Sequence, residues 1–422
     1  MTTETGPQLG AWTVRGTDRD EYPDVLSVVM EALLAPEEAE QALAQRRPFA
    51  DAQGYDRILV ATDHTHQIIG TTRSLPLDMT LPGGIRRVAG VTGVGVWPTH
   101  RRRGVLTALM RRQLADLRAA GESYAALWAS EGSIYGRFGY GPTTTEIEAG
   151  IDTAHAELRA NTPRDRELTV QLARPTDVRT DLETIFARAA QKELGRFRRD
   201  PSWWDRILRD LPEQRGGQGP LRAVLVHNAH GPVGYALYRT LKKWETTGSR
   251  SELVVQEIIA TTATAHVALY EHLFSRDLIT RVVFDHLPHD TPLLWLLADR
   301  QRLARTLFES LWLRLVDVPT ALSERTYATP FDVRLEVSDR YAPWNAGRWH
   351  VEADTEGARV QATDQACDLS LDVSHLGAAY LGQKPLLGAL RAGLVIEHTP
   401  GTVARLDTAL HRPDPAFCGM VF

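Results

Sequence analysis

The sequence predicts a mixed α/β fold of the α+β kind, in which helices and sheets pack as layers in more than one domain. Apolar residues recur at helical spacing in some segments and alternate with polar residues in others. The order of helices, strands and turns in the first 150 residues returns in weaker form after about residue 180. A third pattern, of short alternating segments, begins near residue 305. Together these patterns indicate a repeated domain followed by a different one.

The first block alternates helices and strands in an order typical of an α/β layered domain. Turn-forming residues separate the segments, as in "DHTHQ" and "LPGG". The predicted elements are a helix at 24–43, strands from Ile58 and Ile68, a long strand at 85–96, an arginine-headed helix ending before Gly121, and a strand at 124–129.

The second block repeats this order with a different helix start. We predict a helical region at 181–211 that buries Trp203 and Trp204, then two strands, and then a strand, a turn and a helix over 253–274. Residues 261–264 read Thr-Thr-Ala-Thr where the first block has arginines and Gly104. This difference predicts one functional site and one site that has lost its function.

The third block is read as antiparallel strands from about residue 331, followed by one or two helices within 372–393. The chain ends in the apolar run "AFCGMVF". Exposed termini usually fray, so an apolar terminus predicts burial.

Composition excludes several classes of protein. The 422 residues are 43% hydrophobic and 24% charged, which is ordinary for globular domains. The net charge of −5 disfavours a general nucleic-acid binder. The start lacks the basic and apolar regions of a signal peptide, and no apolar run approaches the roughly 18 residues that cross a bilayer. Cys367 and Cys418 have no metal-ligand spacing. We therefore expect a cytoplasmic protein with reduced thiols, no membrane segment and no metal.

The stretch "THRRRGVLTAL" places Arg101, Arg102 and Arg103 at the start of a helix. A helix N-terminus carries partial positive charge and unpaired N–H groups, so it favours acids rather than arginines. The same N–H groups, with arginines and Gly104 beside them, suit a polyanionic phosphate. The pattern is neither a Walker A loop nor a dinucleotide fingerprint. A solvated basic face is the alternative interpretation.

The flanking residues resemble the GNAT superfamily of acyl-CoA N-acetyltransferases. "RRRGVL" is similar to its pyrophosphate motif, with Leu106 as a departure, and "SIYGRFGY" is similar to its tyrosine segment. The longer string "VTGVGVWPTHRRRGVLTALM…ASEGSIYGRFGYGP" resembles the enhanced-intracellular-survival (Eis) branch. The resemblance implies a catalytic GNAT domain at 1–155, a degenerate GNAT-like domain at 156–304, and a sterol-carrier-protein-like α/β domain at 305–422.

The resemblance also implies roles for individual residues. Tyr135 corresponds to the general acid of the family, and the C-terminal carboxylate of Phe422 to its base, which would dock the apolar tail into the first domain. Acetyl-CoA is the implied co-substrate, with an amine acceptor and a homo-oligomer, a hexamer, as partners. The implied acetyl-CoA contacts are Val94, Gly95, Val96, Arg102, Arg103, Gly104, Val105, Leu106, Thr107, Ser130 and Glu131.

Amine acetylation needs the groups that the resemblance supplies. A lysine-like amine has a pKa near 10.4, so its neutralisation at pH 7 costs roughly 4.6 kcal/mol and a positioned carboxylate can accept the proton. Tyrosine is a weaker acid than a thiol, but it can stabilise the developing thiolate by hydrogen bonding. A backbone N–H near Val94 to Val96 is the candidate donor to the acetyl oxygen. Each of these residues also has an interpretation without a catalytic or binding role. Tyr135 would only pack against its neighbours, Phe422 would be a buried terminal aromatic residue, and Glu131 would cap a helix.

The sequence predicts transfer to an amine of a small molecule, aminoglycoside-like or another amine-bearing metabolite, or of a peptide. Asp24, Glu31, Glu37 and Glu38 are possible cation-facing acids, with a solvated face as the stronger interpretation, and Tyr22 is a possible cleft residue. Pocket details decide the substrate, so antibiotic resistance does not follow from the resemblance alone. A protein lysine acetyltransferase, a non-catalytic acyl-CoA or lipid sensor, and an anion-binding module are the competing functions.

Overall fold

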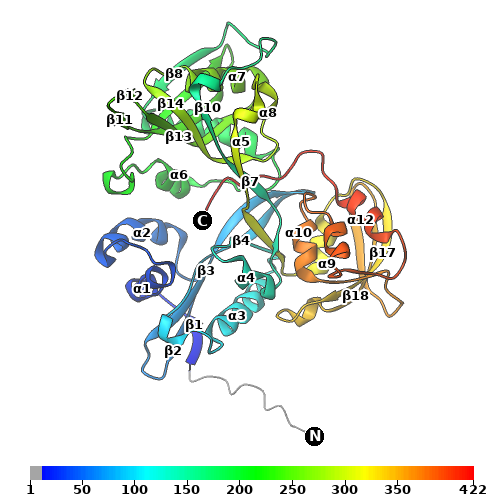
Figure 1. Cartoon of the computed structure of the whole chain (residues 1–422). Helices are drawn as coiled ribbons and strands as arrows, with labels where there is room; N and C mark the ends of the chain where they lie inside the picture. Colours follow the sequence, from blue (N-terminus) through cyan, green and yellow to red (C-terminus); the bar gives the residue numbers. More distant parts are fainter. Residues whose placement is uncertain (1–11) are drawn as a thin grey trace. The chain divides into compact units, whose positions relative to one another are not determined.

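The computed structural model describes residues 12–422, and these form two compact units (Figure 1). The first unit contains the chain up to residue 143, residues 311–412 and the last two residues. The second unit contains residues 144–310 and 413–420. No helix in this described part of the chain is long and apolar enough to cross a membrane. The opening residues, which we expect to lack a signal peptide, lie outside it.

The first unit is built on a seven-stranded sheet in the order β1-β2-β3-β4-β5-β16-β6. β4 and β5 are parallel, and their pairing is limited to Ala89 with Ala125 and Gly90 with Ala126. β4 continues well past this pairing along β3, so the sheet opens between β4 and β5. The strands are β1 Trp12–Gly16, β2 Ile58–Asp63, β3 Ile68–Leu81, β4 Gly84–Val96, β5 Tyr124–Trp128, β6 Gly141–Pro142 and β16 Leu311–Leu315.

Helices cover both faces of this sheet. Met110 and Leu114 of α3 pack with Ala89 and Val91 of β4 in one buried cluster. α1 approaches β4 from the other face, because a Cβ on Gly95 would lie 2.9 Å from the Ala32 Cβ. The helices are α1 Tyr22–Leu33, α2 Ala39–Gln53, α3 Val105–Ala119 and α4 Gly132–Tyr135.

The single helix predicted at 24–43 is wrong, because two helices, α1 and α2, cover this region. α1 ends at Leu34, which takes a left-handed conformation with φ +55°. Pro36 follows, and proline disfavours helical geometry in the residue before it. The apolar spacing persists across the break because both helices bury one face, with Met30 and Ala42 in a shared cluster.

The second unit has a similar seven-stranded sheet, in the order β15-β7-β14-β13-β10-β9-β8, with β13 and β14 parallel. The predicted helical region 181–211 is again two helices, α5 and α6. The Asp200 side chain caps the start of α6. Trp203 and Trp204 are buried, as expected. The elements are β7 Thr145–Asp152, β8 Thr169–Ala173, α5 Arg179–Ala190, α6 Pro201–Leu208, β9 Arg222–Asn228, β10 Gly231–Leu241, β11 Trp244–Glu245, β12 Gly248–Ser249, β13 Ser251–Ala260, α7 Ala263–Phe274, β14 Ile279–Pro288, α8 Leu293–Leu296 and β15 Ala304–Glu309.

A third sheet, β19-β18-β17-β20-β21, completes the first unit. It is fixed to the first sheet by a buried ion pair between Arg314 and Asp339, 2.6 Å apart. The hydroxyls of Tyr124 and Tyr380 also lie 2.9 Å apart across this junction. The elements are α9 Val318–Glu324, β17 Phe331–Ser338, β18 Gly347–Ala353, β19 Ala358–Ala362, β20 Leu369–Asp372, α10 Val373–Ala379, α11 Leu386–Arg391, β21 Ile396–Glu397 and α12 Thr402–Leu410.

The apolar C-terminal tail forms neither helix nor strand, and most of it is buried as predicted, although the Val421 side chain is exposed. Ala416, Phe417, Cys418 and Met420 are all less than 7% exposed. Their environment differs from the expectation, because residues 413–420 belong to the second unit and only the last two residues belong to the first.

Candidate active site

A groove of about 480 Å³ lies where β4 and β5 separate. Val94, Gly95 and Val96 form one wall, beyond the last pair that β4 makes with β5. The loop after β5 and the start of α3 supply the other walls. The edge of β4 that faces β5 has no strand partner here among the described residues. Its peptide groups are therefore available to a ligand.

The N-terminus of α3 is open toward this groove. Gly104 is the N-cap residue, with φ +92°, a left-handed conformation that glycine adopts without strain. No side chain caps this end, and the first turn contains no acid. The N–H groups of the first turn and the positive end of the helix dipole therefore remain available to an anion.

The three arginines before α3 are exposed, and within residues 12–422 none of them forms an ion pair with a carboxylate. Arg101 and Arg102 line the groove. By contrast, Arg112 on the same helix pairs with Asp116 at 2.8 Å. The described residues therefore do not neutralise the cluster, which distinguishes it from a salt-bridged surface.

Tyr135 reaches the groove from α4, the short helix after β5. The residue is 7% exposed, and its ring packs edge-on against Tyr140 with centroids 6.2 Å apart. Burial, with a smaller contribution from the Glu131 charge, raises the pKa of Tyr135 to about 12. The hydroxyl is therefore protonated at neutral pH and available as a hydrogen-bond donor.

The structure brings most of the predicted site residues together in this groove. Arg103 and Phe422 are the exceptions, since neither lines it. The predicted residues that do line it are Val94, Gly95, Val96, Arg102, Gly104, Val105, Leu106, Thr107, Ser130, Glu131 and Tyr135.

Phe422 contacts the same strand nearer its start. A Cβ built on Gly90 would lie 3.2 Å from the Phe422 ring. Ala89 and Val91 face α3, so alternation directs the side-chain position of Gly90 to the opposite face, which α1 covers. The Phe422 ring therefore lies on β4 at the last residue before the strands separate.

Comparison with known proteins gives the family. Residues 13–143 and 195–315 each match a model of the acetyltransferase (GNAT) domain, and residues 318–419 match the sterol carrier protein domain. The chain is 40% identical over 342 residues to an uncharacterised N-acetyltransferase of Streptomyces avermitilis, covering 81% of this chain and 83% of that protein. It is 38% identical over 357 residues to the N-acetyltransferase Eis of Mycobacterium tuberculosis, with the same coverage.

The chain belongs to the GNAT acetyltransferases, in the Eis branch. The structure is similar to that of Eis1 from Mycobacterium abscessus, with a TM-score of 0.81 and 32% identity over 97% of this chain and 100% of that one. A GCN5-related N-acetyltransferase from Anabaena variabilis shares the fold, with a TM-score of 0.82 at 17% identity. The predicted family and fold class are confirmed, and the protein is an acetyl-transferring enzyme.

The second GNAT domain lacks the long loop and the uncapped helix start that the first domain has beside its groove. Two residues, 261–262, connect β13 to α7, whereas eight residues, 97–104, connect β4 to α3. The Thr262 hydroxyl also accepts a hydrogen bond from the Ala265 N–H, so it caps α7. This domain therefore has no counterpart of the arginine loop and no open helix end.

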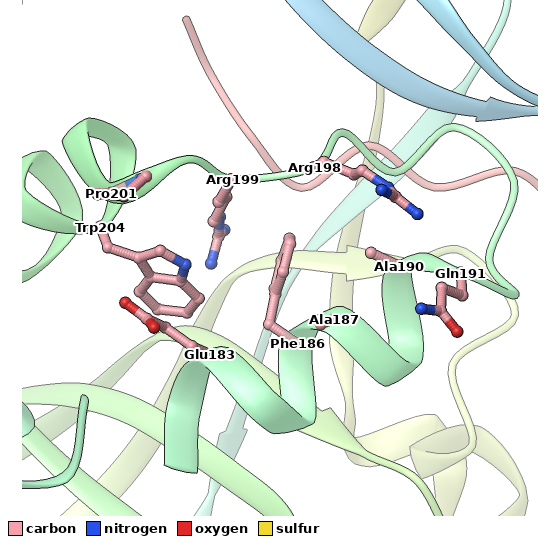
Figure 2. A pocket seen from close by; sticks show the side chains of 9 residues that line it. All are labelled: Glu183, Phe186, Ala187, Ala190, Gln191, Arg198, Arg199, Pro201 and Trp204. Carbon is pink, nitrogen blue, oxygen red and sulfur yellow. The ribbon is translucent and has the colours of Figure 1, made fainter. Parts of the chain in front are cut away.

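Side chains from α5, from α6 and from the segment between them line a hollow in the second GNAT domain. Figure 2 shows Arg199 between the rings of Phe186 and Trp204, with its carbon Cζ 3.9 Å and 5.0 Å from their centroids. Arg199 also pairs with Glu257 of β13 at 2.6 Å. Arg198 and Gln191 line the same hollow. The contacts of Arg199 with Phe186, Trp204 and Glu257 therefore occupy the centre of this hollow with the protein's own side chains.

Sequence reasoning missed several residues of the groove in the first GNAT domain. Arg137 adds an exposed cation from the segment after Tyr135. Its place within "YGRFGY", beside the tyrosine motif, was the available signal. Ala32 and Leu33 come from the end of α1, and only tertiary packing brings them here. The remaining missed residues are His100 and Ile134.

Two alternative interpretations of nearby residues are wrong. Glu131 stands at the N-cap of α4, but its side chain makes no capping hydrogen bond. Tyr22 is buried against Tyr55, with ring centroids 5.3 Å apart, instead of lining the cleft. Asp24, Glu31 and Glu38 are exposed, which confirms the solvated interpretation for these three. Glu37 is half-buried and pairs with Arg46 at 3.4 Å.

Proposed function

We propose that this chain transfers an acetyl group from acetyl-CoA to an amine of a small molecule or a peptide, in the groove of its first GNAT domain. The observation that carries the proposal is the open start of α3, with its unneutralised arginines, at one end of a groove that Tyr135 also lines. Bound acetyl-CoA supplies the activated acetyl thioester.

The residues present suit such a molecule. Arg101, Arg102 and the N–H groups of the first turn of α3 would bind a pyrophosphate by charge-assisted hydrogen bonds. Val94 to Val96 would lie along the pantetheine, because their edge of β4 lacks a strand partner. Arg103 and Arg137 would add charge near the same end.

The reaction needs a proton acceptor, an oxyanion donor and a group that stabilises the thiolate. A backbone N–H of Val94 to Val96 would donate to the carbonyl oxygen as negative charge develops there. The attacking amine must lose a proton, and the α-carboxylate of Phe422 would accept it. The neutral Tyr135 hydroxyl would donate to the sulfur as its bond to the acetyl carbon breaks.

Thiol release from acetyl-CoA, measured with a panel of amines, tests the proposal. The panel contains aminoglycosides, polyamines and lysine-containing peptides. Turnover with any of them identifies the acceptor class, and turnover with peptides alone supports a protein lysine acetyltransferase. Saturable acetyl-CoA binding without turnover across the panel would favour the sensor function, and no binding at all would contradict the proposal.

The arginine loop gives a separate prediction for binding. Replacing Arg101 and Arg102 together by Ala should raise the Kd of acetyl-CoA at least tenfold and leave kcat within about twofold, since the lost contacts lie away from the reacting atoms. Isothermal titration at two salt concentrations measures this effect, and the salt dependence should decrease. The control is Arg112→Ala, because Arg112 pairs with Asp116 on the same helix. An unchanged Kd would remove the loop from the pyrophosphate site.

The other expectations stay predictions. We propose the domain division 1–155, 156–304 and 305–422 and a homohexamer on the resemblance, and a cytoplasmic location on the sequence composition. Light scattering of the purified protein measures the number of subunits. Activity that is unchanged after treatment with a chelator is the expected result for a reaction without a metal.

A further inference from the structure

In each GNAT domain, the two parallel strands at the centre of the sheet stop pairing part-way along their length. In the first, β4 and β5 stop pairing after Gly90 and Ala126. In the second, β13 and β14 pair in parallel up to Val255 and Phe284, and β13 then continues without β14. In each domain a register shift lies just beyond the last parallel pair, between Thr92 and Gly95 of β4 and between Val255 and Glu257 of β13. The second domain therefore keeps the cleft although it lacks the arginine loop.

The C-terminal tail occupies this second opening. Residues 414, 415, 417 and 419 line the same cavity as 256–260 of β13 and 286–288 of β14. We call this place the tail cleft, and it includes Leu194, Arg196 and Glu146, which contact the tail. The chain's own tail therefore lies in the second domain where the first domain has its groove.

Three contacts hold the tail in the tail cleft, and a fourth orients one of the residues that bind it. The Phe417 N–H donates to the Leu194 carbonyl at 2.8 Å, and the Arg196 guanidinium lies 4.6 Å from the centre of the Phe417 ring. The Gly419 N–H donates to the Glu146 Oε1 at 3.1 Å. The other Glu146 oxygen lies 3.0 Å from His286 Nδ1. Glu146 is fully buried, so its orientation is set by these partners.

The backbone of the tail is shaped for this cleft. Gly419 has φ +59°, and a Cβ there would lie 2.8 Å from the Phe417 ring. The chain turns at this glycine, and Met420 is buried after it. Two residues remain, and they span at most about 7 Å. Fixing Met420 therefore confines the terminal carboxylate to a small volume.

We propose that the second GNAT domain positions the terminal carboxylate of Phe422, with Arg196 and Glu146 as positioning residues that act through the tail. This inference rests on the proposed function, in which that carboxylate accepts the proton of the amine. A tail of ten residues without this anchor would sample many positions, and misplacement of a catalytic group by about 1 Å can cost 100-fold. The degenerate domain thus contributes to catalysis without binding acetyl-CoA.

The test uses the full chain with Phe417→Ala and, separately, Arg196→Ala. Each variant should lose 10- to 100-fold in kcat at pH 7 and keep the Kd of acetyl-CoA. Arg196→Lys should recover most of the loss, because it keeps a cation over the ring. The matched control is Arg276→Ala, which removes a similar contact with Tyr238 in the same unit but away from the tail. Thermal melting shows that each protein is folded.

The pH profile separates positioning from a general structural defect. The loss should shrink above about pH 9.5, where solvent deprotonates the amine, whereas a structural defect would persist at every pH. The loss should also be absent from a chain that is already extended past Phe422. Additive losses in that double variant, or folded Phe417→Ala and Arg196→Ala variants with normal kcat, would overturn the proposal.

The proposed base and the positioning of the tail are overturned by different results. If extension past Phe422 leaves kcat unchanged, the proposed base is wrong and the positioning inference is wrong with it. If extension slows the enzyme but folded variants of the tail cleft do not, the base stands and only the positioning inference is overturned.

Discussion

Extending the chain by two residues past Phe422 should lower kcat about 1,000-fold at pH 7, with little change in the Kd of acetyl-CoA. The extension replaces the terminal carboxylate by a peptide carbonyl, which cannot accept a proton. General-base catalysis contributes about 100- to 10,000-fold in enzymes, and a lysine-like amine is almost entirely protonated at this pH. Steady-state kinetics with the acceptor from the amine panel measures the effect.

The control for the extension is a chain with the same two residues added at its N-terminus. An acceptor amine that is already neutral at pH 7 should lose much less activity than a lysine-like one, since it needs no base. Equal activity of the extended and native chains would remove Phe422 from the mechanism. Glu131 or an ordered water would then become the proton acceptor to test.

Tyr135→Phe should lower kcat about 100-fold, because the thiolate loses its hydrogen-bond donor at the moment the thioester breaks. The ring remains, so the packing against Tyr140 and the affinity for acetyl-CoA should persist. Rapid-mixing measurements of thiol release quantify the chemical step. A loss seen only in KM would assign Tyr135 to binding.

The pH profile provides a second measurement for Tyr135. Burial raises its pKa to about 12, so the neutral, donating form persists well above the ordinary tyrosine range. The native enzyme should therefore show no activity loss from tyrosine ionisation below about pH 11. Tyr140 offers a matched control, because it lies beside Tyr135 but does not line the groove. A Tyr140→Phe chain should retain kcat within about threefold.

Local sequence patterns predicted most helices and strands. They failed where a helix is interrupted while the helical spacing of apolar residues continues. Residues 24–43 keep one apolar stripe across two helices, because the apolar faces of both helices meet in one buried cluster that contains Met30 and Ala42. Residues 34–38, with the left-handed Leu34 and Pro36, separate them. The arginine loop and the Tyr135 segment were predictable because their residues lie next to one another in the chain.

Membership of the sheets was not predictable in the same way. β15 at Ala304–Glu309 joins the second sheet, and β16 at Leu311–Leu315, one residue later, joins the first. Both segments are extended, so their spacing is alike. Partners more than 150 residues away decide where each strand pairs, and no local signal encodes this choice.

The sequence by itself determined the family, the repeated domain plan, the open helix start and the apolar character of the tail. Each is a property of neighbouring residues, whose spacing sets backbone preference and the face that becomes buried. Only the tertiary structure decided that the groove forms where β4 leaves β5, and that the tail lies in the matching cleft of the second domain. These outcomes depend on burial and hydrogen bonds between distant segments, whose free energy exists only once the sheets have assembled.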